Sequence, residues 1–109
     1  MDTVIEILRM CRVTSKYRGY FYLPAAIELA LQFGEEPFRI TKDIYPQLAE
    51  RYQVTSYAID CGIRTVIERC WLNNRELVKH ILGYDPHKCP TNTELIEAMV
   101  YYLSKQSCH

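Results

Sequence analysis

Residues 41–71 read TKDIYPQLAERYQVTSYAIDCGIRTVIERCW, and this stretch decides the fold. Apolar side chains recur at helical spacing in two parts of it, which predicts one helix over residues 42–52 and another over 55–71. Only Gln53 and Val54 lie between the two helices. Helices joined by so short a link must cross sharply, which is the geometry of a helix-turn-helix, although the glycine often found in that turn is absent.

The helix over 42–52 has one irregular feature, Pro46. We expect Thr41 to be its N-cap, because a threonine hydroxyl accepts hydrogen bonds from the first free amides of a helix. Pro46 has no N–H to donate to the carbonyl one turn back. Either the helix bends there, or its regular part begins at Tyr45-Pro46 with the proline in the first turn, where a missing N–H costs nothing.

The helix over 55–71 has one apolar face. With ~100° of rotation per residue, this face consists of Ile59, Ile63, Val66, Ile67 and Cys70. We therefore expect the core to lie on this side and Ile63 and Trp71 to be largely buried.

The opposite face carries Tyr57, Cys61, Arg64, Thr65 and Glu68, with Asp60 at its edge. A helix fits the major groove of DNA, where an arginine fork matches O6 and N7 of guanine and a carboxylate accepts from the cytosine amino group. At the helix start, free amides and hydroxyls can hold a phosphate. The candidate base-reading residues are Tyr57, Asp60, Cys61, Arg64 and Thr65. The candidate phosphate-binding residues are Lys42, Thr55, Ser56 and Lys88.

Four further helices complete the predicted fold. Their ranges are 2–12, 23–33 followed by Gly34, 75–82 closed by Gly83, and 92–105, which follows a capping box formed by Thr91 and Glu94. Residues Tyr20–Leu23 are treated as the lead into the second helix, since no partner strand for them exists elsewhere. The predicted class is an all-α, six-helix domain containing a helix-turn-helix.

The composition is that of one ordinary globular domain, spanning 1–109. The net charge is zero, which argues weakly against a nucleic-acid binder, but Arg9, Arg12, Lys16 and Arg18 form a run without acids. The longest uncharged run, 20–27, is too short to span a membrane. The mixed N-terminus is not a secretory signal, and the five cysteines form no Cys-x-x-Cys pair, so we expect free thiols in a reducing cytoplasm.

No enzyme or cofactor site is expected. His80, His87 and Cys89 match no common zinc spacing, and a closed zinc site needs four ligands. No nucleophile–base pair, glycine-rich phosphate loop or paired carboxylates stand out.

Short motifs, several of them with rare residues, occur in a fixed order along nearly the whole chain: Gly19-Tyr20, Tyr22-Leu23, Ala26-Ile27, Ile40-Thr41-Lys42, Tyr45-Pro46, Ile63-Arg64, Ile67-Glu68, Trp71, Gly83-Tyr84, Pro90-Thr91-Asn92 and Glu94. In these motifs the chain resembles the C-terminal effector domain of the stage-zero sporulation response regulator A of spore-forming bacteria. The resemblance implies a six-helix fold around a helix-turn-helix, binding to short promoter boxes in double-stranded DNA, and control of transcription. It also implies side-by-side copies on tandem boxes and contact with RNA polymerase.

The resemblance assigns roles on the helix over 55–71 and shows two departures. Arg64 matches a family arginine that reads a base, and Asp60 stands where the family has a glutamate. Cys61 replaces a second base-reading arginine, and a thiol cannot make a bidentate guanine contact. The segment 85–89 is shorter than in the family and has fewer lysines.

Two alternatives remain open from the sequence. The family protein also has an N-terminal phospho-acceptor receiver domain, which is not present in these 109 residues. The chain is then either an excised domain or a free-standing variant. In function, the alternative to DNA reading is a protein-interaction module that keeps the fold, which the neutral charge and Cys61 favour.

Overall fold

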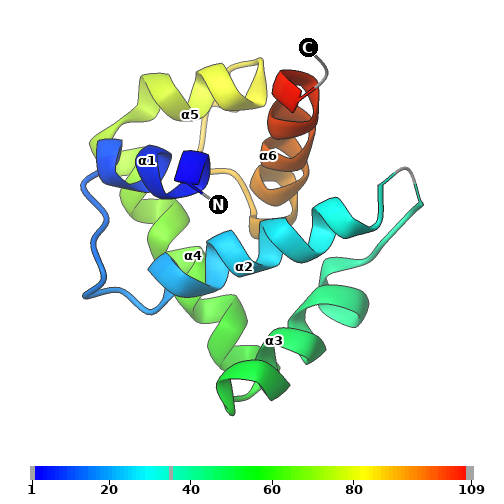
Figure 1. Cartoon of the computed structure of the whole chain (residues 1–109). Coiled ribbons are helices and arrows are strands. Elements are labelled where there is room, and N and C mark those ends of the chain that lie inside the picture. The colour runs from blue at the N-terminus through cyan, green and yellow to red at the C-terminus, as the bar shows by residue number, and fades with distance from the viewer. Residues whose placement is uncertain (1, 35, 108–109) are drawn as a thin grey trace.

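The computed structural model describes residues 2–34 and 36–107, and within these ranges all of its regular secondary structure is helical (Figure 1). In chain order the elements are α1 (Asp2–Met10), α2 (Gly19–Gln32), the π-helical turn η1 (Ile40–Ile44), α3 (Tyr45–Tyr52), α4 (Ser56–Asn73), α5 (Arg75–Leu82) and α6 (Asn92–Ser107). The six α-helices confirm the predicted class, and no strand is found in the described ranges.

The centre of the fold is the crossing of α2 over α4, visible in Figure 1. At this crossing Gly19 and Gly62 bring the two backbones together. A Cβ atom on Gly19 would overlap the carbonyl oxygen of Gly62, and a Cβ on Gly62 would lie 2.9 Å from Cδ2 of Tyr22. Only glycine permits so close an approach, because it has no side chain to hold the helices apart.

The core-facing side of α4 is as predicted. Ile59, Ile63 and Val66 are fully buried, and Trp71 is 7% exposed, which confirms the expected burial of Ile63 and Trp71. Each such aliphatic side chain stabilises the fold by roughly 1.5–3 kcal/mol relative to its exposed state. The facing of α4 is therefore fixed by the apolar side chains that it buries.

The turn between α3 and α4 is built without glycine. Gln53 adopts the left-handed conformation (φ 55°, ψ 49°) that glycine usually supplies. The N–H of Val54 donates to the carbonyl of Ala49 at 2.9 Å, and that of Gln53 donates to the carbonyl of Glu50. Thr55 then caps α4, with its Oγ1 accepting from the N–H of Ala58 at 3.0 Å. The sharp crossing expected of a helix-turn-helix is thus made by two consecutive caps.

Two predicted helix ends are wrong. α2 begins at Gly19 rather than Leu23, so Tyr20–Leu23 lie inside the helix, where Tyr22 and Leu23 are buried. The close packing of Gly19 on α4 favours helix there, although aromatic residues prefer strands. α1 ends at Met10 rather than at Arg12, because Arg12 takes a left-handed conformation and the N–H of Val13 donates back to Leu8.

The start of the helix-turn-helix also differs from prediction at Thr41. Thr41 lies inside η1 and is not an N-cap; the residue before the turn is Arg39, whose N–H donates to the Asp43 carboxylate at 2.7 Å. Of the two alternatives for Pro46, the second is confirmed, since α3 begins at Tyr45 with Pro46 in its first turn. The N–H of Tyr45 reaches five residues back, to Ile40, so the chain widens just where Pro46 would crowd a regular helix.

Other ends are held by side chains. The capping box before α6 is confirmed: Oγ1 of Thr91 accepts from the N–H of Glu94 at 3.1 Å, and the Glu94 carboxylate accepts from the N–H of Thr91 at 3.2 Å. Asn73 and Asn74, at the junction of α4 and α5, donate to carbonyls at the end of α1.

The cysteines and the membrane prediction can be placed on this fold. Cys11, Cys61, Cys70 and Cys89 are free thiols, while Cys108 lies outside the described residues. Within the described ranges, each helix is too short or too polar to cross a bilayer.

Candidate nucleic-acid interface

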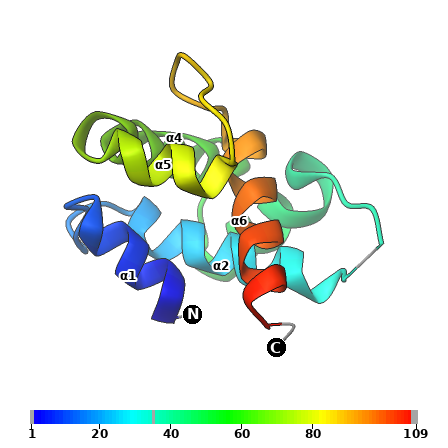
Figure 2. The same ribbon diagram turned by 90° about the horizontal axis from the view of Figure 1, so that it is seen from above.

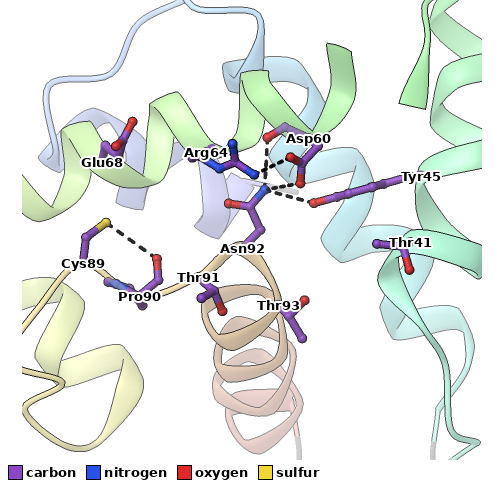
Figure 3. Close-up of a pocket in the computed structure, with 10 residues that line it drawn as sticks. All are labelled: Thr41, Tyr45, Asp60, Arg64, Glu68, Cys89, Pro90, Thr91, Asn92 and Thr93. Carbon is purple, nitrogen blue, oxygen red and sulfur yellow. Dashed lines mark hydrogen bonds and ion pairs between the residues drawn. The ribbon is translucent and has the colours of Figure 1, made fainter. Parts of the chain in front are cut away.

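The outer face of α4 lies open between the end of η1 and the start of α6 (Figure 3). On this face Tyr57 is 75% exposed, and the side chain of Arg64 is 57% exposed. The expectation that Arg64 projects away from the core is therefore confirmed. Beside it is an open cleft of about 340 Å³, lined by Thr41, Tyr45, Asp60, Arg64, Glu68 and residues 89–93.

Arg64 is paired with Asp60, one turn earlier on α4. Its Nη2 lies 2.6 Å from Oδ2 of Asp60. The Asp60 side chain is only 26% exposed, so the pair joins a largely open guanidinium to a largely covered carboxylate. A charge-assisted bond of this length is short for the type. This bond holds the guanidinium at Nη2, and its other N–H groups take no part in it.

The other oxygen of the Asp60 carboxylate is bound by α6. Nδ2 of Asn92 lies 3.0 Å from Oδ1 of Asp60, 3.0 Å from the Asp60 carbonyl oxygen and 3.0 Å from the hydroxyl oxygen of Tyr45. Burial raises the pKa of Tyr45 to about 12, so its hydroxyl stays protonated at neutral pH. Figure 3 shows these bonds meeting at the Asn92 amide, from Tyr45 on α3 and from Asp60 on α4.

The remaining predicted base-reading residues lie along the same face. Tyr57 forms a hydrogen bond with the half-buried Cys61, and this bond raises the pKa of the Tyr57 hydroxyl. Thr65 is exposed, and its Oγ1 donates to the carbonyl of Cys61 at 2.9 Å, which uses the hydroxyl proton and leaves the oxygen able to accept. The structure therefore brings all five residues onto one helix face, with Asp60 at its inner edge.

The predicted phosphate-binding residues are spread around this face. Thr55 and Ser56 are at the start of α4, where the N–H groups of Ser56 and Tyr57 precede the first intrahelical bonds. Lys42 is exposed on η1, and Lys88 is exposed in the loop between α5 and α6. Figure 2 shows that loop projecting from the side of the molecule on which α4 lies. None of these four residues lines the cleft.

The residues considered for zinc do not gather. His80 packs edge-on against Tyr102, with ring centroids 5.9 Å apart, whereas His87 lies exposed in the loop. Sγ of Cys89 donates to the carbonyl of Pro90. Within residues 2–34 and 36–107, there is no group of three or more potential metal ligands.

Two residues of the site, Asn92 and Tyr45, were not predicted as site residues. Asn92 is 9% exposed, an unusual burial for an amide side chain in the first turn of a helix. Its partner Asp60 is 32 residues away in the sequence. Helical periodicity relates residues within one helix, so it gave no signal for this contact; the only clue is the polar Asn92 at the start of an otherwise apolar helix face.

A comparison with protein families gives an independent result. The family model described as "Sporulation initiation factor Spo0A C terminal" matches residues 4–103, a range that includes residues of every helix. It describes a non-catalytic helix-turn-helix domain, in agreement with the predicted fold and with the expectation that the chain is not an enzyme. No solved structure matches the chain.

Proposed function

Because the chain belongs to the Spo0A C-terminal family of DNA-binding transcription regulator domains, we propose that it reads a specific DNA sequence with α4 in the major groove. The observation that carries the proposal is the placement of Arg64. Its guanidinium is exposed on the outer face of α4, while Ile59, Ile63 and Val66 bury the opposite face. An arginine presented in this way suits the O6 and N7 acceptors of guanine.

The neighbours of Arg64 complete a reading surface. A guanidinium has five N–H donors, and the bond to Asp60 engages Nη2, so donors remain for a base. Tyr57 and Thr65 offer hydroxyl and apolar surface, and Cys61 offers a small contact to a thymine methyl. Asp60 enters the reading set as the partner of Arg64, since both of its carboxylate oxygens are already bound.

Contacts to the DNA backbone would set the register of α4. Thr55 and Ser56 present the helix start, whose amides and partial positive charge favour a phosphate. Lys42 and Lys88, on either side of α4 in the chain, are exposed and suited to neighbouring phosphates. We propose that residues 1–109 act in this way as one effector domain, in the cytoplasm where promoter DNA is found.

Selected-site binding on the parent protein tests the proposal, with two variants beside it. Arg64→Ala should weaken binding to the preferred site by roughly 1–3 kcal/mol and relax the preference at one base pair. Lys42→Ala is the matched backbone variant, and it should weaken all sequences equally and reduce the salt slope by about one unit.

A parent that selects no sequence, in a titration that includes low salt, would exclude DNA reading. The protein-interaction module would then be the better description, consistent with the net charge of zero. Equal losses for Arg64→Ala on all sequences would place Arg64 on the phosphates instead.

We further propose that copies bind tandem boxes side by side and contact RNA polymerase there. Free in solution, the chain should be a monomer or a weak dimer, with closer association on DNA that carries two boxes. Sedimentation with one-box and two-box duplexes measures this, and a tight dimer without DNA would contradict it.

A further inference from the structure

We propose that Asn92 is a positioning residue for Arg64, which acts through Asp60 to fix the guanidinium before DNA is bound. The inference rests on the proposed function, in which Arg64 reads a base, and names a specificity-determining residue for it. Asn92 itself is buried at the start of α6 and does not belong to the exposed face.

The chain of contacts is direct. Asn92 donates to Oδ1 of Asp60 at 3.0 Å, and Arg64 donates to Oδ2 of the same carboxylate at 2.6 Å. The carboxylate therefore bridges a buried amide and an exposed guanidinium. It cannot rotate about its Cβ–Cγ bond without losing a hydrogen bond on each side.

Asn92 is itself held in place. Its Nδ2 also lies 3.0 Å from the carbonyl oxygen of Asp60 and 3.0 Å from the hydroxyl oxygen of Tyr45. Tyr45 is 3% exposed, and the turn of α6 that carries Asn92 is fixed by the Thr91–Glu94 capping box. The anchor of the network is thus buried, the Asp60 side chain is 26% exposed, and Arg64 at the end of the network is its most exposed member.

The physical effect is pre-organisation. An exposed ion pair one turn apart on a helix is weak, because both side chains must give up rotamer freedom and salt screens their attraction. Here the hydrogen bond from Asn92 already restricts the rotamers of the Asp60 side chain in the folded protein, before DNA is bound. Arg64 then has fewer rotamers to lose when it meets a base, which is how rigid groups gain selectivity. The neutral amide adds no charge that would compete with Arg64 for the carboxylate.

The experiment compares Asn92→Ala with Glu97→Gln, a control further along α6 whose side chain is exposed and does not line the cleft. In the DNA-free protein, ¹⁵N relaxation of the Arg64 Nε–H should show a more mobile guanidinium in Asn92→Ala and an unchanged one in Glu97→Gln. Selected-site binding should show discrimination at the Arg64 base pair reduced by about fivefold in Asn92→Ala, part of what one bidentate contact supplies. Binding to mixed DNA should change little.

A double variant separates positioning from a general structural role. In an Arg64→Ala background, Asn92→Ala should cause no further loss of discrimination, since its effect passes through Arg64. Tyr45→Phe removes one hydroxyl of the network and leaves Asn92 and the ring in place, so it provides the same test with less risk to folding. It should give a smaller change in the same direction.

The outcomes separate this inference from the proposed function. If the parent selects a site and both Asn92→Ala and Tyr45→Phe keep full discrimination, the inference is overturned and the function stands. If losses in the Arg64→Ala background equal those in the parent, Asn92 acts independently of Arg64 and the inference again fails. If the parent selects no sequence, the proposed function fails, and the inference about reading fails with it.

Discussion

The two faces of α4 are held in different ways. Its inner face is a row of fully buried aliphatic side chains, Ile59, Ile63 and Val66, packed against other helices. Its outer face is held by directional bonds, from Arg64 to Asp60 and from Asn92 to Asp60. The inner face needs apolar side chains of suitable volume, whereas the outer face needs particular atoms at particular positions.

This difference separates stability from specificity within one helix. Packing free energy depends on buried area and tolerates exchange among similar apolar residues. A hydrogen-bonded network loses its geometry when one member is removed. We therefore expect substitutions on the inner face to lower the free energy of unfolding, and substitutions on the outer face to change which DNA sequences are preferred.

The largest expected effect is on the inner face. Ile63→Ala should lower the free energy of unfolding by roughly 2–5 kcal/mol, because it leaves a cavity at a fully buried position. Thermal and denaturant unfolding measure this, with the exposed Thr65→Ala as the control, expected within about 0.5 kcal/mol of the parent. Equal stability of the two variants would mean that α4 is turned differently about its axis.

The next effect concerns the crossing of α2 and α4. Gly19→Ala introduces a Cβ where the carbonyl oxygen of Gly62 already lies, so the helices must separate. Overpacking of this kind costs roughly 1–3 kcal/mol. The contact is tested by comparing the unfolding curves of Gly19→Ala and Gly34→Ala. At Gly34 no atom lies within 4 Å of an added Cβ. Gly34 has a left-handed φ, so the control variant carries backbone strain of its own. A milder loss for Gly19→Ala than for Gly34→Ala would contradict the close crossing.

On the outer face, Cys61→Arg should leave stability nearly unchanged and strengthen DNA binding. It introduces the second arginine that the family resemblance implies there, and one good bidentate contact contributes roughly 1–3 kcal/mol of discrimination. Selected-site binding should recover a guanine preference at one further base pair. Cys61→Lys is the matched control, because it adds the charge without the planar fork. If both variants gain equally on all sequences, the new side chain contacts phosphate.

The smallest effect concerns the cap that holds Asn92 in place. Hydrogen bonds from the N–H and hydroxyl of Thr91 lower the pKa of Glu94 below its ordinary value. A lowered pKa means that this contribution to stability is present above the ordinary carboxyl pKa and is lost as pH falls through the lowered one. The melting temperatures of the parent and of Glu94→Gln should differ slightly at neutral pH and converge in acid. A gap that widens in acid would reverse the sign of this linkage.

What could be predicted from the sequence follows the same division between the faces. Periodicity was sufficient for the inner face of α4, since the repeat is local and the packing needs only apolar character. It was insufficient at Gly19, where a contact with α4 extends α2 through Tyr20–Leu23. Periodicity also did not predict η1. The steric clash of Pro46 with a regular helix can be relieved by a bend or by a helix that begins at Tyr45, and periodicity does not distinguish the two. The contact of Asn92 with Asp60 could not be predicted from periodicity either, because the two residues lie on different helices.

The contact between Gly19 and Gly62 has a consequence for evolutionary change in this molecule. Where two helices meet through side chains, each substitution of a core residue alters the distance between the helices. It thereby changes the orientation of the side chains on their exposed faces. Here the closest approach is to a backbone atom, the carbonyl oxygen of Gly62 opposite Gly19. We therefore expect a change of size at Leu23 or Ile27 to lower stability and to tilt α4 less than it would at a crossing made by side chains. The scaffold and the recognition surface could then diverge at separate rates.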